Sequence, residues 1–176
     1  MTVLTRTPQN TNLLQPTKFL LTFTRIPDVQ YFCQEVNIPG ATMPEAQIQS
    51  PFHNYTIAGL NIQYNLLNIG FLVDESLRSW RNIYNWFLAI SSPVGFEERN
   101  RYQMIQNGGV LPNFPSYSDA ILTIMSNLNN PIARVQFYNA FPTSLSDISF
   151  DTKSSADHII TADASFNYEY FEFLDP

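Results

Sequence analysis

The 176-residue sequence has few of the side chains that most often carry chemistry, with one cysteine and two histidines. A single thiol, Cys33, excludes an intrachain disulfide, and within a predicted strand it is expected to be a small buried hydrophobic side chain. His53 and His158 lack a second ligand at metal-binding spacing, and no GxSxG, CxxC or phosphate-binding glycine loop is present. The sequence therefore predicts no catalytic, metal or cofactor site and no enzyme activity.

Charged side chains are also scarce, at 14% of the residues, where about 25% is usual. The net charge of −6 comes entirely from residues 147–176, because the first 146 residues balance to zero. Without a basic stripe, tight binding to nucleic-acid phosphates or to anionic membranes is not expected. A polar surface of Asn, Gln, Ser and Thr instead favours packing against neighbouring proteins.

Long hydrophobic runs are absent as well, so no membrane anchor is predicted. The opening residues, MTVLTRTPQNTN, lack the apolar core of a signal peptide. The composition of residues 1–16, with Pro8 and Pro16, predicts a flexible or extended N-terminal arm. The length favours a single domain for residues 17–176.

Aromatic residues are plentiful, and the strongest pattern lies near the C-terminus. Ala162, Ala164, Phe166, Tyr168 and Tyr170 alternate with polar residues, which predicts a strand with one buried face. Because no crossover helix follows this strand, it must pair in an antiparallel sheet. The predicted fold class is mainly β, an antiparallel β-barrel or sandwich.

Other strands are predicted along the chain. Proline at position 51 demotes residues 46–57 to an edge strand or a projecting loop. A register shift is expected near Leu66–Leu67, a turn at Pro27–Asp28 and a kink at Phe141–Pro142. The strand segments are Lys18–Thr24, Tyr31–Ile38, Asn61–Val73, Ala120–Met125, Arg134–Tyr138 and Leu145–Phe150.

One flanking amphipathic helix is predicted at about residues 75–90. Asp74 or Ser76 is expected to cap it, and its apolar stripe contains Trp80, which is expected in the core. Trp86 lies near the opposite side and is expected to face a neighbouring protein. Residues 93–117, rich in glycine and proline, predict a long loop with a functional or interfacial role.

The order of four segments resembles the tail-tube proteins of contractile-tailed bacteriophages. After an opening strand, the segments are FCQEVNIPGATMP, LNIGFLVDESLRSWRNIYNWF, NAFPTSLSDISFD and ADASFNYEYFEF. The resemblance covers about Lys18–Phe173, whereas the Thr/Asn-rich arm and the 93–117 loop depart from a plain tube subunit.

The resemblance implies a structural virion protein of the tail, whose copies form six-fold rings of the tail tube and let the genome DNA pass without specific binding. It also implies contacts with adjacent tail rings and with sheath or baseplate proteins, and a location in the virion tail after synthesis in the host cytoplasm. The same lineage includes tube-like proteins that cap one end of the tube, either the baseplate initiator or the terminator (completion) protein.

The acidic C-terminal region offers candidate functional residues. Asp163 and Glu169 lie on the polar side of the last strand, where they are expected either to face the channel and repel DNA or to bond neighbouring copies. Two other function classes stay open. One is a β-sandwich module that binds a host-surface glycan or protein through outer aromatics and the 93–117 loop. The other is an enzyme with carboxylates meeting in a cleft.

Overall fold

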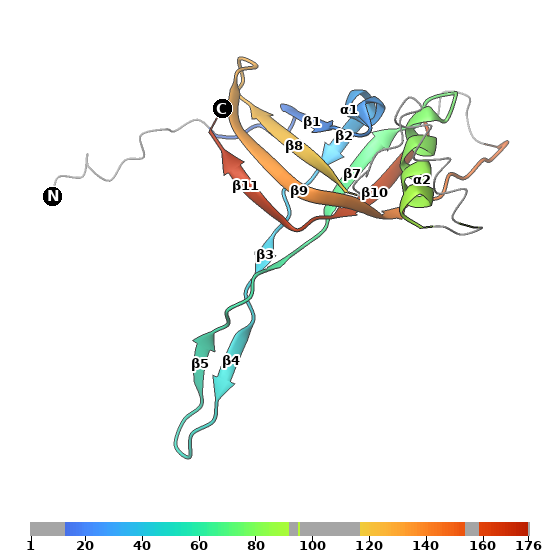
Figure 1. Ribbon diagram of the computed structural model, residues 1–176. Coiled ribbons are helices and arrows are strands. Elements are labelled where there is room, and N and C mark those ends of the chain that lie inside the picture. The colour runs from blue at the N-terminus through green and yellow to red at the C-terminus, as the bar shows by residue number, and fades with distance from the viewer. Residues whose placement is uncertain (1–12, 92–94, 96–116, 154–158, 176) are drawn as a thin grey trace.

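The computed structural model describes residues 13–91, 95, 117–153 and 159–175 of the chain (Figure 1). These residues are mainly β, with antiparallel strand pairs and one long helix, α2 (Arg78–Ile90). The other elements are β1 (Phe19–Phe23), α1 (Pro27–Phe32), β2 (Cys33–Val36), β3 (Ala41–Thr42), β4 (Glu45–Ile48), β5 (Tyr55–Ala58), β6 (Gln63–Tyr64), β7 (Leu67–Leu72), β8 (Ser118–Met125), β9 (Pro131–Leu145), β10 (Thr161–Asn167) and β11 (Tyr170–Leu174).

The seven main strands follow the order β1-β8-β9-β10-β7-β2, and β11 also pairs with β9. The 15-residue β9 belongs to two layers, because its first part pairs with β8 and β11 while its last part pairs with β10. We call β1, β8, the first part of β9 and β11 sheet A, and β2, β7, β10 and the last part of β9 sheet B. The rings of Phe23 in sheet A and Phe166 in sheet B lie 4.8 Å apart in the core between the layers.

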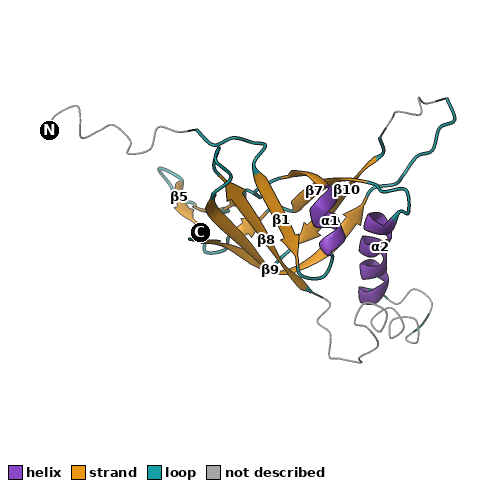
Figure 2. Cartoon of the chain, turned by 90° about the horizontal axis from the view of Figure 1, so that it is seen from above, coloured by secondary structure: helices purple, strands orange, loops and turns teal. Residues whose placement is uncertain are grey.

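The strand path ends at β1 and β2, which do not pair with each other over the described residues, so the barrel is not closed. The predicted β class is confirmed as a β-sandwich with a flanking helix. The chain passes from β1 to β2 through the short helix α1, beside β1 (Figure 2). The prediction of a strand over Tyr31–Ile38 is therefore wrong in its first part. Ile26 and Val29 are both buried three residues apart, which is helical spacing, and proline suits a first helical turn.

The alternation predicted near the C-terminus holds as far as Tyr168. Ala162, Ala164, Phe166 and Tyr168 are buried, but Tyr170 is exposed. The strand breaks between β10 and β11, where the Glu169 N–H donates to Tyr138 O at 3.0 Å. After the break the register changes, and Phe171 packs on the core instead of Tyr170.

One of two predictions about the neighbouring segments is wrong. The expected kink at Phe141–Pro142 stays a prediction: β9 continues through both residues, and Pro142 lies opposite Phe166, next to a register shift. The strand expected over Leu145–Phe150 is not formed, because β9 ends at Leu145 and residues 146–150 belong to no strand. The single strand expected over Asn61–Val73 is wrong, because this segment is divided into β6, which ends at Tyr64, and β7, which begins at Leu67 in another sheet. The register shift expected near Leu66–Leu67 stays a prediction.

Helix α2 begins later than predicted and presents a different face to the core. Leu77, at φ 54°, occupies the N-cap position, and the Asp74 carboxylate accepts a bond from the Ser79 N–H at 3.0 Å. The assignment of the two tryptophans is wrong. Trp86 is 0% exposed and packs near Phe23 and Phe166 (6.4 and 5.8 Å between centroids), whereas Trp80 is only partly buried.

A hairpin arm, residues 40–64, projects from the sandwich (Figure 1). It is the connection between the neighbouring strands β2 and β7, and it contains two short ladders, β3–β6 and β4–β5. The projecting segment predicted for residues 46–57 is thus confirmed. The predicted loop at 93–117 and the first twelve residues lie outside the described residues, apart from residues 95 and 117, and the domain division at residue 17 stays a prediction.

Candidate assembly surfaces

The described residues contain no group of three or more His, Cys, Asp or Glu side chains that could hold a metal ion. Cys33 is partly buried, and desolvation raises the pKa of its thiol to about 11, so the thiolate is suppressed at neutral pH. His53 lies on the hairpin arm against Tyr55 at 5.2 Å, and His158 lies outside the described residues. Across the part of the chain that the structure describes, no helix has the length and apolar character needed to cross a membrane.

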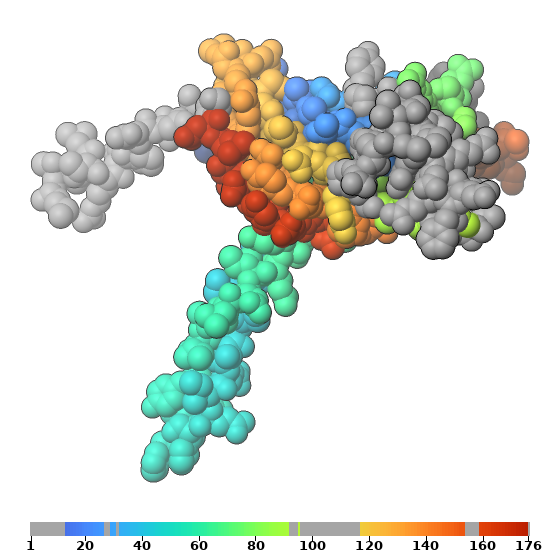
Figure 3. All heavy atoms as spheres, viewed as in Figure 1, coloured from blue at the N-terminus to red at the C-terminus, as the bar shows by residue number. Residues whose placement is uncertain are grey.

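The hairpin arm is the most exposed part of the described chain (Figure 3). Phe52 and Leu60 are 98% and 99% exposed. The arm's other large exposed apolar side chains are Met43, Ile48, Tyr55, Ile57 and Ile62. A two-stranded hairpin is marginally stable alone in water, and clustered exposed apolar side chains mark interaction surfaces. The arm therefore has the chemistry of a segment that binds another protein.

Backbone contacts set the shape of the hairpin arm. At its base the Asn65 N–H donates to Gly40 O at 2.9 Å, and further out the Gly59 N–H donates to Pro44 O at 2.8 Å. A Cβ atom at Gly59 would lie 2.2 Å from Pro44 O, a distance that no side chain can occupy. Glycine is thus required where the two strands of the arm approach between its ladders.

The predicted acidic pair is divided between two places. Asp163 lies on the outer face of sheet B, in register with Gly70 and Glu35 on the adjacent strands. Glu169 lies beyond the break after β10, where its carboxylate accepts a bond from Asn139 Nδ2 at 2.6 Å. The structure brings Asp163 together with Glu35, which sequence reasoning missed because only the strand register brings residues 35 and 163 together.

The outer face of sheet B forms a shallow polar groove. Beside the two carboxylates it carries a bonded series in which Ser165 Oγ donates to Asn68 Oδ1 at 2.8 Å and the Asn68 N–H donates to Asn37 Oδ1 at 2.6 Å. The groove has a volume of about 460 Å³, and none of the described residues that line it is a lysine or an arginine. Its chemistry is that of a wet, weakly acidic wall.

The outer face of sheet A is different, because it carries aromatic and apolar side chains. The rings of Tyr138 and Tyr170 stack at 4.6 Å, and the Tyr138 hydroxyl donates to Glu172 Oε2 at 3.4 Å. Beyond this pair, Ile132 and Leu174 are exposed large apolar side chains. The two outer faces therefore differ: sheet A carries exposed aromatic and apolar side chains beside the charged Arg134 and Glu172, whereas the groove of sheet B is polar and weakly acidic.

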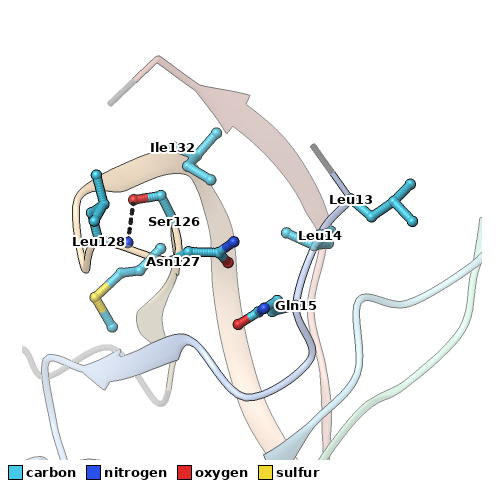
Figure 4. Close-up of a pocket in the computed structure, with 8 residues that line it drawn as sticks. Leu13, Leu14, Gln15, Ser126, Asn127, Leu128 and Ile132 are labelled. Carbon is cyan, nitrogen blue, oxygen red and sulfur yellow. Dashed lines mark hydrogen bonds between the residues drawn. The ribbon is translucent and has the colours of Figure 1, made fainter. Parts of the chain in front are cut away.

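A second apolar surface lies at the β8–β9 turn, and we call it the socket (Figure 4). It opens between the segment that precedes β1 and the turn, with a volume of about 420 Å³. Its lining residues are Leu13, Leu14, Gln15, Met125, Ser126, Asn127, Leu128 and Ile132. None of these side chains is ionisable.

The family model for the phage tail tube protein matches residues 8–174 of the chain that carries these surfaces. The chain belongs to the phage tail tube protein family. The resemblance found in the sequence is thereby confirmed. The family is one of structural proteins of phage tails, which is not an enzyme class.

The chain is 29% identical over 143 residues to the tail tube terminator protein of Enterobacteria phage T4. That match covers 79% of this chain and 74% of the terminator. The tube-terminating cap of the anti-feeding prophage has the same fold, with a TM-score of 0.63, 15% identity and full coverage of both chains. A chain of the sheath/tube terminator complex of the extracellular contractile injection system PVC gives a TM-score of 0.59 at 14% identity. That match covers 93% of this chain and 97% of the other.

Proposed function

We propose that this chain is the tail tube terminator of a phage, a ring of six copies that closes one end of the tube. The main support for the terminator role is the sequence similarity, over 79% of the chain, to a tail tube terminator. Sequence reasoning favoured the main tube subunit and kept the terminator as an alternative; the relatives support the alternative. In the virion, the partners of the ring are the adjacent tube ring and proteins of the sheath or baseplate.

The hairpin arm supports the assembly of rings. It carries seven large exposed apolar side chains and one charged side chain, Glu45. Contact with another protein would remove these apolar side chains from water, which is favourable. Because the arm extends β2 and β7, it leaves the sandwich from sheet B. In a ring, the arm therefore extends beyond its own sandwich, where a neighbouring copy can cover it.

The outer face of sheet B is the proposed channel wall. It presents Glu35 and Asp163 among uncharged polar groups, and no described residue that lines its groove is basic. Negative charge facing the channel repels DNA phosphates, so the genome passes without binding. The open edges of the sheet provide the sites where neighbouring copies pair, which also removes the aggregation hazard of free edges.

The purified protein tests this proposal by light scattering and electron microscopy over a wide concentration range. A terminator forms single six-fold rings that do not lengthen and that stop the growth of tubes when they are added to tube subunits. Continuous tubes of this chain alone would identify it as the main tube subunit instead. A monomer at all concentrations, or a ring of another copy number, would overturn the proposed six-fold ring.

A further inference from the structure

Two apolar surfaces of this chain lie on opposite sides of the sandwich. In Figure 1 the hairpin arm extends downward from the sandwich, whereas the β8–β9 turn, which forms one side of the socket, stands at its upper edge. Among the described residues, the arm tip packs against no part of the sandwich, and the socket holds no side chain from the arm. Neither surface is therefore covered by the described residues of its own chain.

The socket is a built feature, because hydrogen bonds fix the turn that carries it. Ser126 Oγ accepts bonds from the N–H groups of Leu128 and Asn130, each at 3.2 Å, and the Ser126 N–H donates to Asn130 O at 2.7 Å. Lys18 Nζ donates to Asn129 Oδ1 at 2.7 Å, which ties the turn to the segment before β1. This turn holds Leu128 outward, 82% exposed, at the rim of the socket.

The tip of the hairpin arm has the properties that the socket requires. Phe52 is almost fully exposed, and residues 49–62 contain no acidic or basic side chain apart from His53. A cavity of about 150 Å³ accommodates a benzene ring, so a socket of about 420 Å³ has room for the Phe52 ring. Contact between the two surfaces would bury no unpaired charge. A buried unpaired charge is strongly destabilising.

The charges that border the two surfaces have opposite signs. Lys18 stands beside the socket through its bond to Asn129, and Glu45 is the arm's one ionised side chain. A donor surface and an acceptor surface on opposite sides of one molecule are what a head-to-tail contact between identical copies requires. A second copy of this chain therefore fits the socket in chemistry and in position.

We propose that the hairpin arm of one copy inserts its tip, with Phe52 foremost, into the socket of a second copy. This inference rests on the proposed function, because it assumes that copies of the chain assemble. It adds the acceptor site for the arm and assigns Leu13, Leu14, Leu128 and Ile132 to that site.

Disulfide trapping tests the contact, with Cys33→Ser as the background so that no native thiol interferes. Two variants, Phe52→Cys and Leu128→Cys, are purified separately, mixed and oxidised. We expect a crosslinked pair that contains one chain of each variant and that a reductant separates. The matched control replaces Leu128→Cys with Phe150→Cys, an exposed apolar position outside the socket, and should give no such pair.

The same mixture is viewed by electron microscopy, which separates the two proposals. Six-fold rings without the Phe52–Leu128 crosslink would overturn the arm-to-socket contact and leave the proposed function standing. Absence of any assembly would overturn the ring itself. As a second measurement, Leu128→Glu should weaken association at least about tenfold, a change of about 1.4 kcal/mol, without changing the melting temperature. An unchanged association constant would count against the contact.

Discussion

At the scale of residues, the two tryptophans of α2 have different roles although both are aromatic and six positions apart. Trp86 is enclosed by Phe23 and Phe166, with the Arg25 guanidinium 5.3 Å from its ring. Trp80 lies at the margin, where it stacks on Tyr84 and its Nε1–H donates to Ser146 O at 3.1 Å. Trp86 therefore stabilises the core, and Trp80 anchors the helix to the end of β9.

This difference predicts unequal costs of truncation. Trp86→Ala should lower the free energy of unfolding by about 3–5 kcal/mol, as for other large core side chains. Trp80→Ala should cost about 1–2 kcal/mol, because it loses one hydrogen bond and partial packing. Denaturant unfolding of the two variants and the parent protein measures both. Equal losses, or a larger loss at Trp80, would show that the core face of α2 is assigned incorrectly.

A second residue, Asp74, links the start of α2 to pH. Its pKa is held well below the ordinary range, chiefly by a hydrogen bond from the Ser76 hydroxyl and also by the N–H groups of Ser79 and Arg78. A carboxyl with a lowered folded-state pKa contributes stability above its unfolded pKa of about 3.9, and this stability is lost as the pH falls toward the folded value.

Asp74→Asn should therefore flatten the fall in unfolding free energy between about pH 5 and about pH 2. Chemical denaturation at a series of pH values gives the slope. Glu75→Gln is the matched control, since Glu75 is an adjacent exposed carboxylate for which the structure shows no capping bond. If both variants give the same profile as the parent, Asp74 does not provide the proposed pH dependence.

At the scale of elements, the shape of the hairpin arm depends on Gly59, and a substitution at this position does not alter the packing of the core. Gly59→Val places side-chain atoms against Pro44 O, so the β4–β5 ladder must shift or open. We expect loss of assembly with a change in melting temperature of less than about 2 °C, because the arm buries little of the sandwich. Hydrogen exchange should report faster exchange in β4 and β5 only.

Gly95→Ala is the control for this substitution, because a Cβ at Gly95 meets no atom within 4 Å. Normal assembly of Gly59→Val would show that the arm's shape is not needed for association. A large drop in its melting temperature would show instead that the arm and the sandwich unfold together.

The elements also show where sequence periodicity succeeds and fails. The alternation in β10 and the helical pattern of α2 were predictable, because repeated apolar positions report one buried face. The face of α2 was not, since its stripe through Ser79, Ile83 and Trp86 is offset from the more hydrophobic stripe that contains Trp80. The break after Tyr168 depends on a bond from Glu169 to the distant Tyr138, which no local pattern contains.

At the scale of the whole molecule, the distribution of charge matters more than its sum. The acidic character of the C-terminal region was predictable from composition, but the partners of its acids were not. Strand register joins Asp163 to Glu35 across Gly70, whereas Glu169 bonds Asn139 at a different surface. The socket was missed for the same reason, because Leu13 and Leu128 are brought together only by the tertiary fold.

The proposed channel wall predicts a salt-dependent effect on DNA. Glu35→Lys with Asp163→Lys should leave rings intact, since substitutions of exposed side chains usually change stability by less than about 0.5 kcal/mol. The double variant should slow DNA ejection at low salt, and the effect should weaken as salt rises. Ejection from assembled tails at two salt concentrations measures this.

Glu169→Lys is the control, because Glu169 does not share the face of Asp163, and it should eject DNA at the parental rate. If the double variant ejects DNA at the parental rate at low salt, the outer face of sheet B is not the channel wall. Absence of tails from the double variant would instead assign Glu35 and Asp163 to contacts between copies.

The attachment of the hairpin arm has a mechanical consequence. Both of its strands enter sheet B as β2 and β7, and β7 is paired on its other side with β10. A pull on the arm along these strands loads the ladder bonds of β2–β7 and β7–β10 together, in shear, instead of opening them one at a time. The two-residue β3–β6 ladder and the four-residue β4–β5 ladder have fewer bonds to share a load. Under tension the arm should therefore unravel before the sandwich opens, and the joint between neighbouring subunits should stretch while each subunit keeps its shape.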